Sequence, residues 1–251
     1  MERYFEINEQ GHNIRCKLYF NKQQEIHSVI IFCHGFAGHK DNKAAQKFAE
    51  KILTKFKNKA VVVFDWPCHG DDVKKKLTLN DCEIYLRLVI DYVNSAYEAD
   101  ELYAYATSFG AYMVLKYIFA KGNPFKKIAL RCPAVNLYDS FYNVIMQPEE
   151  KELLNRGKNA SVGFDRKIEI NPQFLQDIQE EDVRKMDFLD YADDILILHG
   201  TKDEVIPFSE AEKFSDDNVI ELVAVENADH RFQNPKSMEI ATKAVIDFFG
   251  F

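Results

Sequence analysis

The sequence predicts an α/β protein with a mostly parallel central sheet and helices on both faces. The first observation behind this fold class is that continuous apolar runs of strand length alternate with longer segments of helical periodicity. Such alternation is typical of parallel strands joined by crossover helices. The second is the length of 251 residues, which suits one domain of this kind. We therefore expect a single domain over residues 1–251, with a small cap inserted at about residues 134–190.

The composition of the chain argues against some classes of binding partner. The net charge of −8 disfavours nucleic acids and anionic membrane surfaces, because both attract lysine and arginine. No apolar run approaches the ~20 residues that span a bilayer, and residues 1–6 lack an apolar signal region. The odd number of cysteines without a CxxC pair indicates free thiols and a reducing cytoplasm; they are Cys16, Cys33, Cys68, Cys82 and Cys132. We predict a cytoplasmic protein, and no stretch suggests a metal or cofactor site.

The first half of the chain supplies the start of the sheet. A run such as residues 29–33 (VIIFC) is apolar throughout, which is typical of a strand covered on both faces. Asp41 or Asn42 can cap the helix that follows. The predicted elements are strands at 4–8 and 13–20 with a turn at Gly11, a strand at 29–33, a helix to about Phe56, a strand at 60–64, and a helix carrying Ile84, Leu88, Val89 and Val93.

Ser108 lies where a predicted strand from Leu102 meets a helix from Phe109 to about residue 120. Ala106 and Gly110, two residues to either side, are small, and a tight turn there leaves no room for larger side chains. Such a turn exposes the serine hydroxyl above the positive end of the new helix. The same five residues also suit a serine that simply caps a helix after a buried strand.

The second half resumes the alternation after a break. Residues 127–131 form the fourth parallel strand, and we read the break that follows as a cap or lid with a hairpin arm at 166–170 and a helical turn at 172–179. The alternative is a helical excursion that never contacts substrate. The remaining elements are a strand at 195–198, a helix at 209–214, a strand at 219–225, and a helix at 235–249 that packs Ile240, Ala244, Val245 and Phe248 against the sheet.

Polar residues follow the late strands in an order that suits serine chemistry. A serine nucleophile requires a base within hydrogen-bonding distance and a third group that orients the base. Asp203 follows one strand and His230 follows the next, so both lie at the carboxyl edge of the sheet with Ser108. Asp139 is the fallback acid, since Asp229 adjoins His230 too closely to fold back onto its ring.

With these motifs, nearly the whole chain resembles the α/β-hydrolase superfamily of serine hydrolases. The matching segments are residues 34–38 (HGFAG), 106–110 (ATSFG), 199–207 (HGTKDEVIP) and 228–230 (ADH). The resemblance implies an α/β-hydrolase fold with Ser108 as nucleophile, His230 as general base and then acid, and Asp203 as the orienting carboxylate. It also implies an oxyanion hole made by the backbone N–H groups of Phe36 and Phe109.

His34 and His69 also follow predicted strands, and we expect them to stabilise their loops rather than to act in catalysis.

Within the superfamily, the cap resembles that of short-capped carboxylesterases, including feruloyl and cinnamoyl esterases, and of monoacylglycerol lipases. We therefore predict a serine hydrolase that cleaves small-molecule carboxylic esters, with aromatic or medium-chain acyl groups suggested by the aromatic residues of the cap. The alternatives are a small serine peptidase or acyl-aminopeptidase, although nothing resembles the propeller domain that many such peptidases carry, and a thioesterase. A hydrolase-fold binding protein without activity is the remaining alternative.

Overall fold

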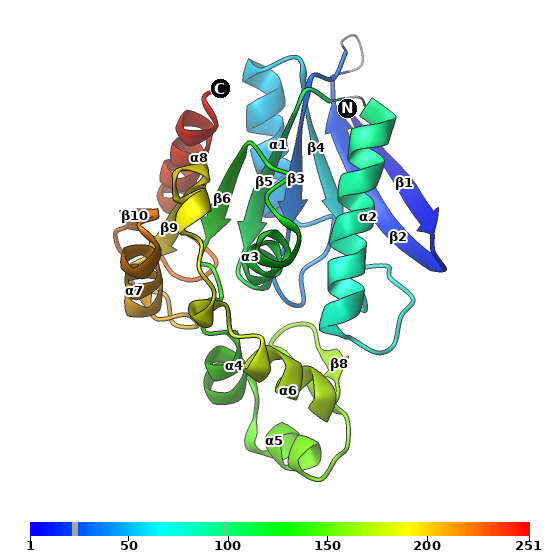
Figure 1. The fold of residues 1–251 in the computed structure, drawn as a ribbon, viewed down its shortest axis with the longest axis vertical. Coiled ribbons are helices and arrows are strands. Elements are labelled where there is room, and N and C mark those ends of the chain that lie inside the picture. Colours follow the sequence, from blue (N-terminus) through cyan, green and yellow to red (C-terminus); the bar gives the residue numbers. More distant parts are fainter. Residues whose placement is uncertain (22–24, 98) are drawn as a thin grey trace.

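The computed structural model describes residues 1–21, 25–97 and 99–251. Its centre is an eight-stranded twisted sheet (Figure 1). In sheet order the strands are β1 (Glu2–Glu9), β2 (His12–Phe20), β4 (Lys59–Phe64), β3 (Ser28–Cys33), β5 (Glu101–Thr107), β6 (Lys127–Arg131), β9 (Ile195–Gly200) and β10 (Glu221–Val225).

The strands from β4 to β10 are parallel, whereas β2 runs antiparallel to both β1 and β4. Every residue of β3 and β9 is buried, as expected for strands that helices cover on both faces. The predicted fold class, a mostly parallel sheet between helices, is confirmed.

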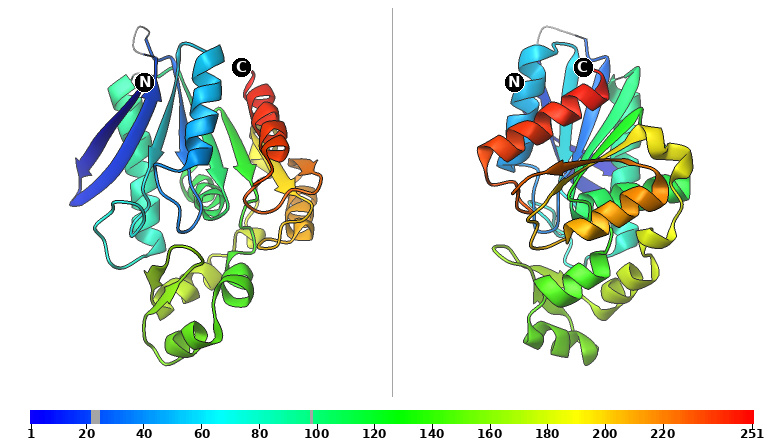
Figure 2. Two further views of the ribbon diagram at one scale, coloured as in Figure 1. Left: turned by 180° about the vertical axis from the view of Figure 1, so that it is seen from behind. Right: turned by 90° about the vertical axis from the view of Figure 1, so that its left-hand side faces the viewer.

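Two layers of helices cover the sheet (Figure 2). The first, α1 (Lys43–Lys55) and α8 (Pro235–Phe249), packs on one face, while α2 (Leu79–Tyr97), α3 (Phe109–Lys121) and α7 (Phe208–Asn218) pack on the other. The predicted cap of α1 is present, because the Asn42 side chain accepts from the Ala45 N–H at 2.8 Å. We call these layers the α1/α8 face and the α2/α3 face.

Two sequence predictions in the last elements are wrong. Ile240 is 52% exposed and does not pack on the sheet, whereas Val245 is buried as predicted and Ala244 and Phe248 pack against the core while partly exposed. The fully buried residues of this stripe also include Ala241 and Phe249. Apolar residues also lie beside this stripe, so periodicity alone did not fix which of them are buried. The predicted strand at 219–225 begins late, because Val219 ends α7 in the left-handed conformation with φ 57°.

Residues 134–194, the inserted segment, connect β6 to β9. The part from α4 to α6 lies beyond the carboxyl ends of the parallel strands, and the remainder returns along the sheet to the amino end of β9 (Figure 1). The predicted hairpin arm is shorter than expected and pairs antiparallel with a strand that the sequence did not reveal. The elements are α4 (Leu137–Ser140), a π-helical turn η1 (Phe141–Ile145), α5 (Pro148–Asn155), β7 (Ala160–Val162), β8 (Ile168–Ile170), α6 (Pro172–Glu180), and the 3-10 turns η2 (Val183–Lys185) and η3 (Leu189–Asp194).

Candidate active site

Ser108 occupies the sharp turn between β5 and α3. Its backbone has φ 51° and ψ −118°, a conformation that costs a residue other than glycine free energy and is often retained at functional sites. The surrounding chain holds it there. The Ser108 N–H donates to the Arg131 carbonyl on β6 at 3.0 Å, and the Ser108 carbonyl accepts from the amides of Ala111 and Tyr112.

Gly110 allows the amino end of α3 to approach the end of β3. A Cβ atom at this position would lie 2.4 Å from the carbonyl oxygen of Cys33 and 2.6 Å from that of His34. The contact that requires a glycine is therefore made with the end of the neighbouring strand β3. This approach brings the loop after β3 next to the serine.

The structure brings Ser108, His230 and Asp203 together from three separate loops. The Ser108 Oγ lies 3.1 Å from His230 Nε2, and His230 Nδ1 lies 2.8 Å from Asp203 Oδ2. His230 follows β10 and Asp203 follows β9, so the parallel strands deliver all three to one edge of the sheet. The arrangement can take a proton from the serine hydroxyl and hold the imidazole ring in a fixed orientation.

The Asp203 side chain is completely buried. Burial alone would raise its pKa, but hydrogen bonds from His199, from His230 and from the Ile206 amide outweigh this effect and hold the pKa well below its usual range. The Val205 amide donates to the same carboxylate at 2.9 Å. Asp203 is therefore an anion wherever the protein is folded near neutral pH.

His199 is a second histidine on this carboxylate, and the sequence reading assigned it no role. Its Nε2 lies 3.2 Å from Asp203 Oδ2 and 3.0 Å from the Ile206 carbonyl oxygen. Both partners accept hydrogen bonds, so Nε2 carries the proton and donates to them. The signal that could have found it was its position, since His199 is the penultimate residue of β9 and lies in the same matching segment as Asp203.

The other acidic candidates do not reach His230. Asp139 forms an ion pair with Arg184 at 2.9 Å in the inserted segment. Asp229 instead accepts a hydrogen bond from the Gln233 amide at 2.9 Å, within its own loop. Asp203 is thus the carboxylate that the fold places against the imidazole ring.

His34 and His69 lie side by side in the interior, with ring centroids 5.6 Å apart. Each Nδ1 donates to a nearby carbonyl oxygen at 2.8 Å, that of Gly35 for His34 and that of Pro67 for His69. Burial lowers the pKa of His34 to about 4 and that of His69 to about 3. Both rings are therefore neutral groups that brace the loops after β3 and β4.

Phe36 and Phe109 flank Ser108. Phe109 is the first residue of α3, where amides have no acceptor within the helix. Phe36 lies in the turn after β3, next to Gly35, whose position for a Cβ is 3.2 Å from the Ser108 Cβ. Their rings pack edge to face at 6.1 Å, so these aromatic side chains anchor the two turns that carry the amides.

A pocket of about 930 Å³ opens above Ser108 and His230. The inserted segment contributes to its wall, as do the loops after β3 and β10. Among the aromatic residues of the inserted segment, Phe164 lines the pocket, whereas Phe141 and Phe174 are buried in contact with Phe36 and Phe109. Most of the aromatic content that suggested an aromatic acyl group therefore serves packing.

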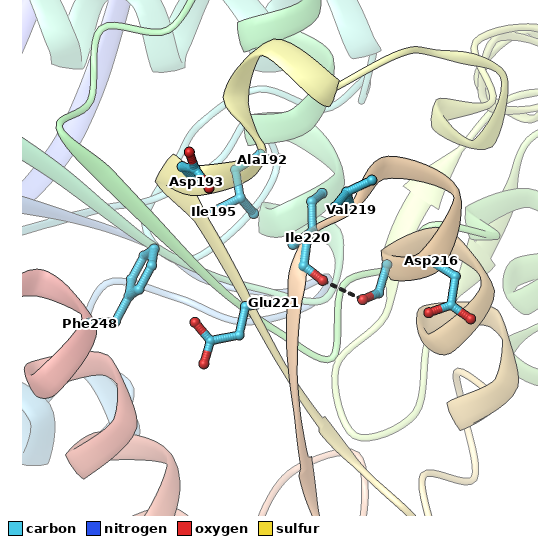
Figure 3. Close-up of a pocket in the computed structure, with 9 residues that line it drawn as sticks. Ala192, Asp193, Ile195, Asp216, Val219, Ile220, Glu221 and Phe248 are labelled. Carbon is cyan, nitrogen blue, oxygen red and sulfur yellow. Dashed lines mark hydrogen bonds between the residues drawn. The ribbon is translucent and has the colours of Figure 1, made fainter.

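A separate hollow of about 450 Å³ lies between the amino ends of β9 and β10 and the helices α7 and α8 (Figure 3). Its polar lining includes the carboxylates of Asp193, Asp216 and Glu221. It is at the opposite end of the strands from Ser108, so it takes no part in the site.

Among the described residues, one group could supply three ligands to a metal ion, namely Cys132, Asp203 and His230, with donor atoms within 4.8 Å of one another. Burial raises the pKa of the Cys132 thiol well above its usual value, so it is protonated and a poor ligand. Hydrogen bonds already occupy Asp203 Oδ2 and His230 Nδ1.

Among the described residues, no helix has the length and apolar character needed to span a bilayer.

Comparison with known proteins agrees with the geometry. Est1E from Butyrivibrio proteoclasticus, solved with bound ferulic acid, is 21% identical and superposes with a TM-score of 0.79 over 98% of this chain and 97% of that chain. A putative hydrolase from Agrobacterium vitis S4 (14% identity, TM-score 0.78, 99% and 98% coverage) and the mouse alpha/beta hydrolase domain-containing protein 10 (15%, 0.73, 99% and 98%) share the fold. Curated protein sequences gave no match.

The model of the prolyl oligopeptidase family, Peptidase_S9, matches residues 64–250. This match includes β5, the turn at Ser108, and the loops that carry Asp203 and His230. The chain is therefore a member of the prolyl oligopeptidase family, with the α/β-hydrolase fold of serine hydrolases.

Proposed function

We propose that the protein hydrolyses carboxylic esters of small molecules through an acyl-serine intermediate, as a carboxylesterase. The observation that carries this proposal is the hydrogen-bonded series from Ser108 Oγ through His230 to Asp203 at the base of the pocket. A serine hydroxyl alone is a weak nucleophile, and a base at 3.1 Å is what activates it.

In the proposed mechanism, His230 Nε2 takes the proton of Ser108 as Oγ attacks the ester carbonyl. Negative charge develops on the carbonyl oxygen, and the N–H groups of Phe36 and Phe109 stabilise it. His230 then gives the proton to the leaving alcohol. In the second half of the reaction, His230 takes a proton from a water molecule as this water attacks the acyl-serine, and gives it to Ser108 Oγ as the acid leaves. Asp203 keeps the imidazole in the required tautomer throughout.

We propose that residues 1–251 are one domain in which the inserted segment acts as a lid. Two contacts tie its 163–167 turn to the core beside the pocket. Asp165 pairs with Arg231 at 2.8 Å, and Arg166 donates to the Gly70 carbonyl at 2.7 Å. A lid held by these contacts can shield the bound substrate from bulk solvent while it still admits the water that hydrolyses the acyl-serine.

The substrate class rests on pocket size and on similarity of fold. A volume of about 930 Å³ accommodates an aromatic or medium-chain acyl group together with its alcohol. Est1E, which was solved with ferulic acid, has the same fold. We also assign the protein to the cytoplasm, where five cysteines without a disulfide remain reduced.

The family match favours a second candidate, a small serine peptidase or acyl-aminopeptidase. The same series of residues cleaves amides when the pocket holds a peptide. A peptidase that binds a free amino terminus needs unpaired carboxylates for the ammonium group. Of the two carboxylates in the pocket lining, Asp165 pairs with Arg231, and Glu204 accepts from the His230 N–H. Three arginines, Arg131, Arg166 and Arg231, outnumber them, and this excess of positive charge favours neutral or anionic substrates.

A fluorophosphonate probe tests the nucleophile, and a panel of nitrophenyl esters, feruloyl esters, thioesters and aminoacyl amides tests the reaction. We expect labelling of the wild type, none of Ser108→Ala, and turnover of esters above amides. Labelling that survives Ser108→Ala would exclude the proposed nucleophile. Amide turnover well above ester turnover would assign the protein to the peptidases.

A further inference from the structure

Arg131 is a buried cation at the end of β6 that lines the pocket. Its side chain is 7% exposed, and Nε has no hydrogen-bond partner. The guanidinium group lies 5.3 Å from the centre of the Phe232 ring, and Nη1 donates to Met238 Sδ at 3.3 Å. A thioether is a weak acceptor, so these contacts position the group and leave its charge without a counter-ion.

The other buried cations of the described chain are all paired. Lys17 lies 3.0 Å from Glu2, Lys40 lies 3.2 Å from Asp65, and Lys116 lies 2.7 Å from Glu83. Within the described residues Arg131 has no carboxylate within ion-pair distance. Burying a charge without a partner costs free energy. Because the other buried cations in the described part of the chain are paired, the unpaired charge of Arg131 is the one that an anionic ligand can neutralise.

The position of Arg131 connects it to Ser108. Thr107 and Arg131 are register partners on β5 and β6, so their side chains stand next to each other on the α1/α8 face. Thr107, Asn42 and Gln233 line this part of the pocket. The pocket wall beside Ser108 therefore carries the polar side chain of Thr107 and the positive charge of Arg131.

We propose that Arg131 binds a carboxylate group of the substrate, so that the protein acts on esters that carry a free carboxylate, such as monoesters of dicarboxylic acids or esters of hydroxycarboxylic acids. This inference rests on the proposed ester hydrolysis and adds the charge of the substrate. The ligand carboxylate supplies the counter-ion that the fold omits. A hydrogen bond between two charged groups contributes about 1.5–3 kcal/mol, which corresponds to roughly 10- to 150-fold in affinity.

Two matched substrate pairs test the inference. For the acyl side, mono-4-nitrophenyl glutarate is compared with methyl 4-nitrophenyl glutarate, which has the same chain and no charge. For the alcohol side, 3-butyryloxybenzoic acid is compared with its methyl ester. We expect kcat/KM for the acid to exceed that for the neutral ester by about tenfold or more in one pair, mainly through KM. The pair that shows it tells on which side of the scissile bond the carboxylate lies.

Variants assign the preference to one side chain. Arg131→Met should abolish it and Arg131→Lys should keep part of it, with fluorophosphonate labelling of Ser108 as evidence that each variant is folded. The control is Arg156→Met, which should keep the preference, because this exposed arginine caps the carboxyl end of α5 and pairs with Glu152. A preference that persists in Arg131→Met, or is lost in Arg166→Gln instead, would overturn the assignment.

A binding measurement separates this inference from the proposed function. Glutarate should slow fluorophosphonate labelling of the wild type more than acetate does, and should lose this effect in Arg131→Met. Absence of labelling in the wild type contradicts the serine-hydrolase proposal itself. Labelling and ester turnover without any preference for acids, and without protection by glutarate, contradict only the carboxylate site.

Discussion

The N–H of Ser108 donates to the carbonyl of Arg131 at 3.0 Å, which joins the turn after β5 to the last residue of β6. The proposed nucleophile and the proposed carboxylate anchor are therefore neighbours in one rigid sheet. Sites built on strands hold their geometry better than sites built on loops. The distance from a substrate carboxylate to the scissile bond is thus set by the sheet, while the inserted segment sets only the outer wall.

Replacing Asp203 with asparagine should preserve the fold and remove most of kcat. An amide can donate to His230 Nδ1, which stabilises the wrong tautomer, and in other serine hydrolases this change costs ~10⁴-fold. Steady-state kinetics on a nitrophenyl ester, with circular dichroism for folding, measures the effect. The control is Asp139→Asn, which disturbs the ion pair with Arg184 and should retain activity. Comparable losses in both variants would contradict the assignment of the acid.

His199 should act as a positioning residue for Asp203. His199→Phe removes the hydrogen bond to the carboxylate and should lower kcat about 10-fold or more with little change in KM. His199→Gln keeps a donor close to the place of Nε2 and should restore much of the rate. If both variants lose the same amount, or if the loss is in KM, the hydrogen bond to Asp203 has no part in catalysis.

Gly110→Ala should destabilise the protein by about 2–3 kcal/mol, because the new Cβ meets the Cys33 and His34 carbonyls and the surrounding backbone must shift. Urea unfolding gives the change. Gly122→Ala is the matched control: its φ of +85° also disfavours alanine, but no atom lies within 4 Å of the new Cβ. We expect that variant to lose only about 1 kcal/mol. Equal losses would mean that the approach of α3 to β3 is not tight.

Stability should fall as the pH drops from about 6.5 towards about 4. His34 and His69 have pKa values of about 4 and about 3 in the folded protein, below the ordinary value of 6.5. The unfolded chain therefore binds protons in this window that the folded protein excludes, and each histidine removes about 1.4 kcal/mol per pH unit. The lowered pKa of Asp203 adds to the loss only at still lower pH.

Urea unfolding at pH 7.5, 6 and 5 measures this dependence. His69→Asn should flatten the slope by about one proton, whatever its effect on stability at pH 7.5. Equal unfolding free energies at pH 7.5 and 5 in the wild type would show that the two rings are charged in the folded protein.

Much of the fold could be predicted because most strands are recognisable from their own short runs of apolar residues. The runs at 29–33 and 102–106 are apolar throughout. Parallel strand order then places Ser108, Asp203 and His230 at one edge of the sheet. The three-residue strand β7 carries no periodicity of its own and exists because β8 pairs with it. Its presence depends on a contact that no short window contains.

The missing parts of the site have the same cause. In the sequence, nothing distinguishes Arg131 from the other residues of β6. It stands out only in the folded structure, where its buried Nε has no hydrogen-bond partner among the described residues. His199 gains its role only when the loop folds back to place Asp203 against its ring. Such information lies in distances between chain segments, and a sequence pattern gives the order of the segments without giving these distances.

The order in which the site residues occur has a consequence for synthesis. Ser108 and the turn at Phe36 belong to the part of the chain that leaves the ribosome first, whereas Asp203 and His230 follow the inserted segment. A nascent chain that has reached only the end of β6 carries the serine without a base. The proposed base joins the proposed nucleophile last, after β10, and a chain that ends before His230 carries Ser108 without it.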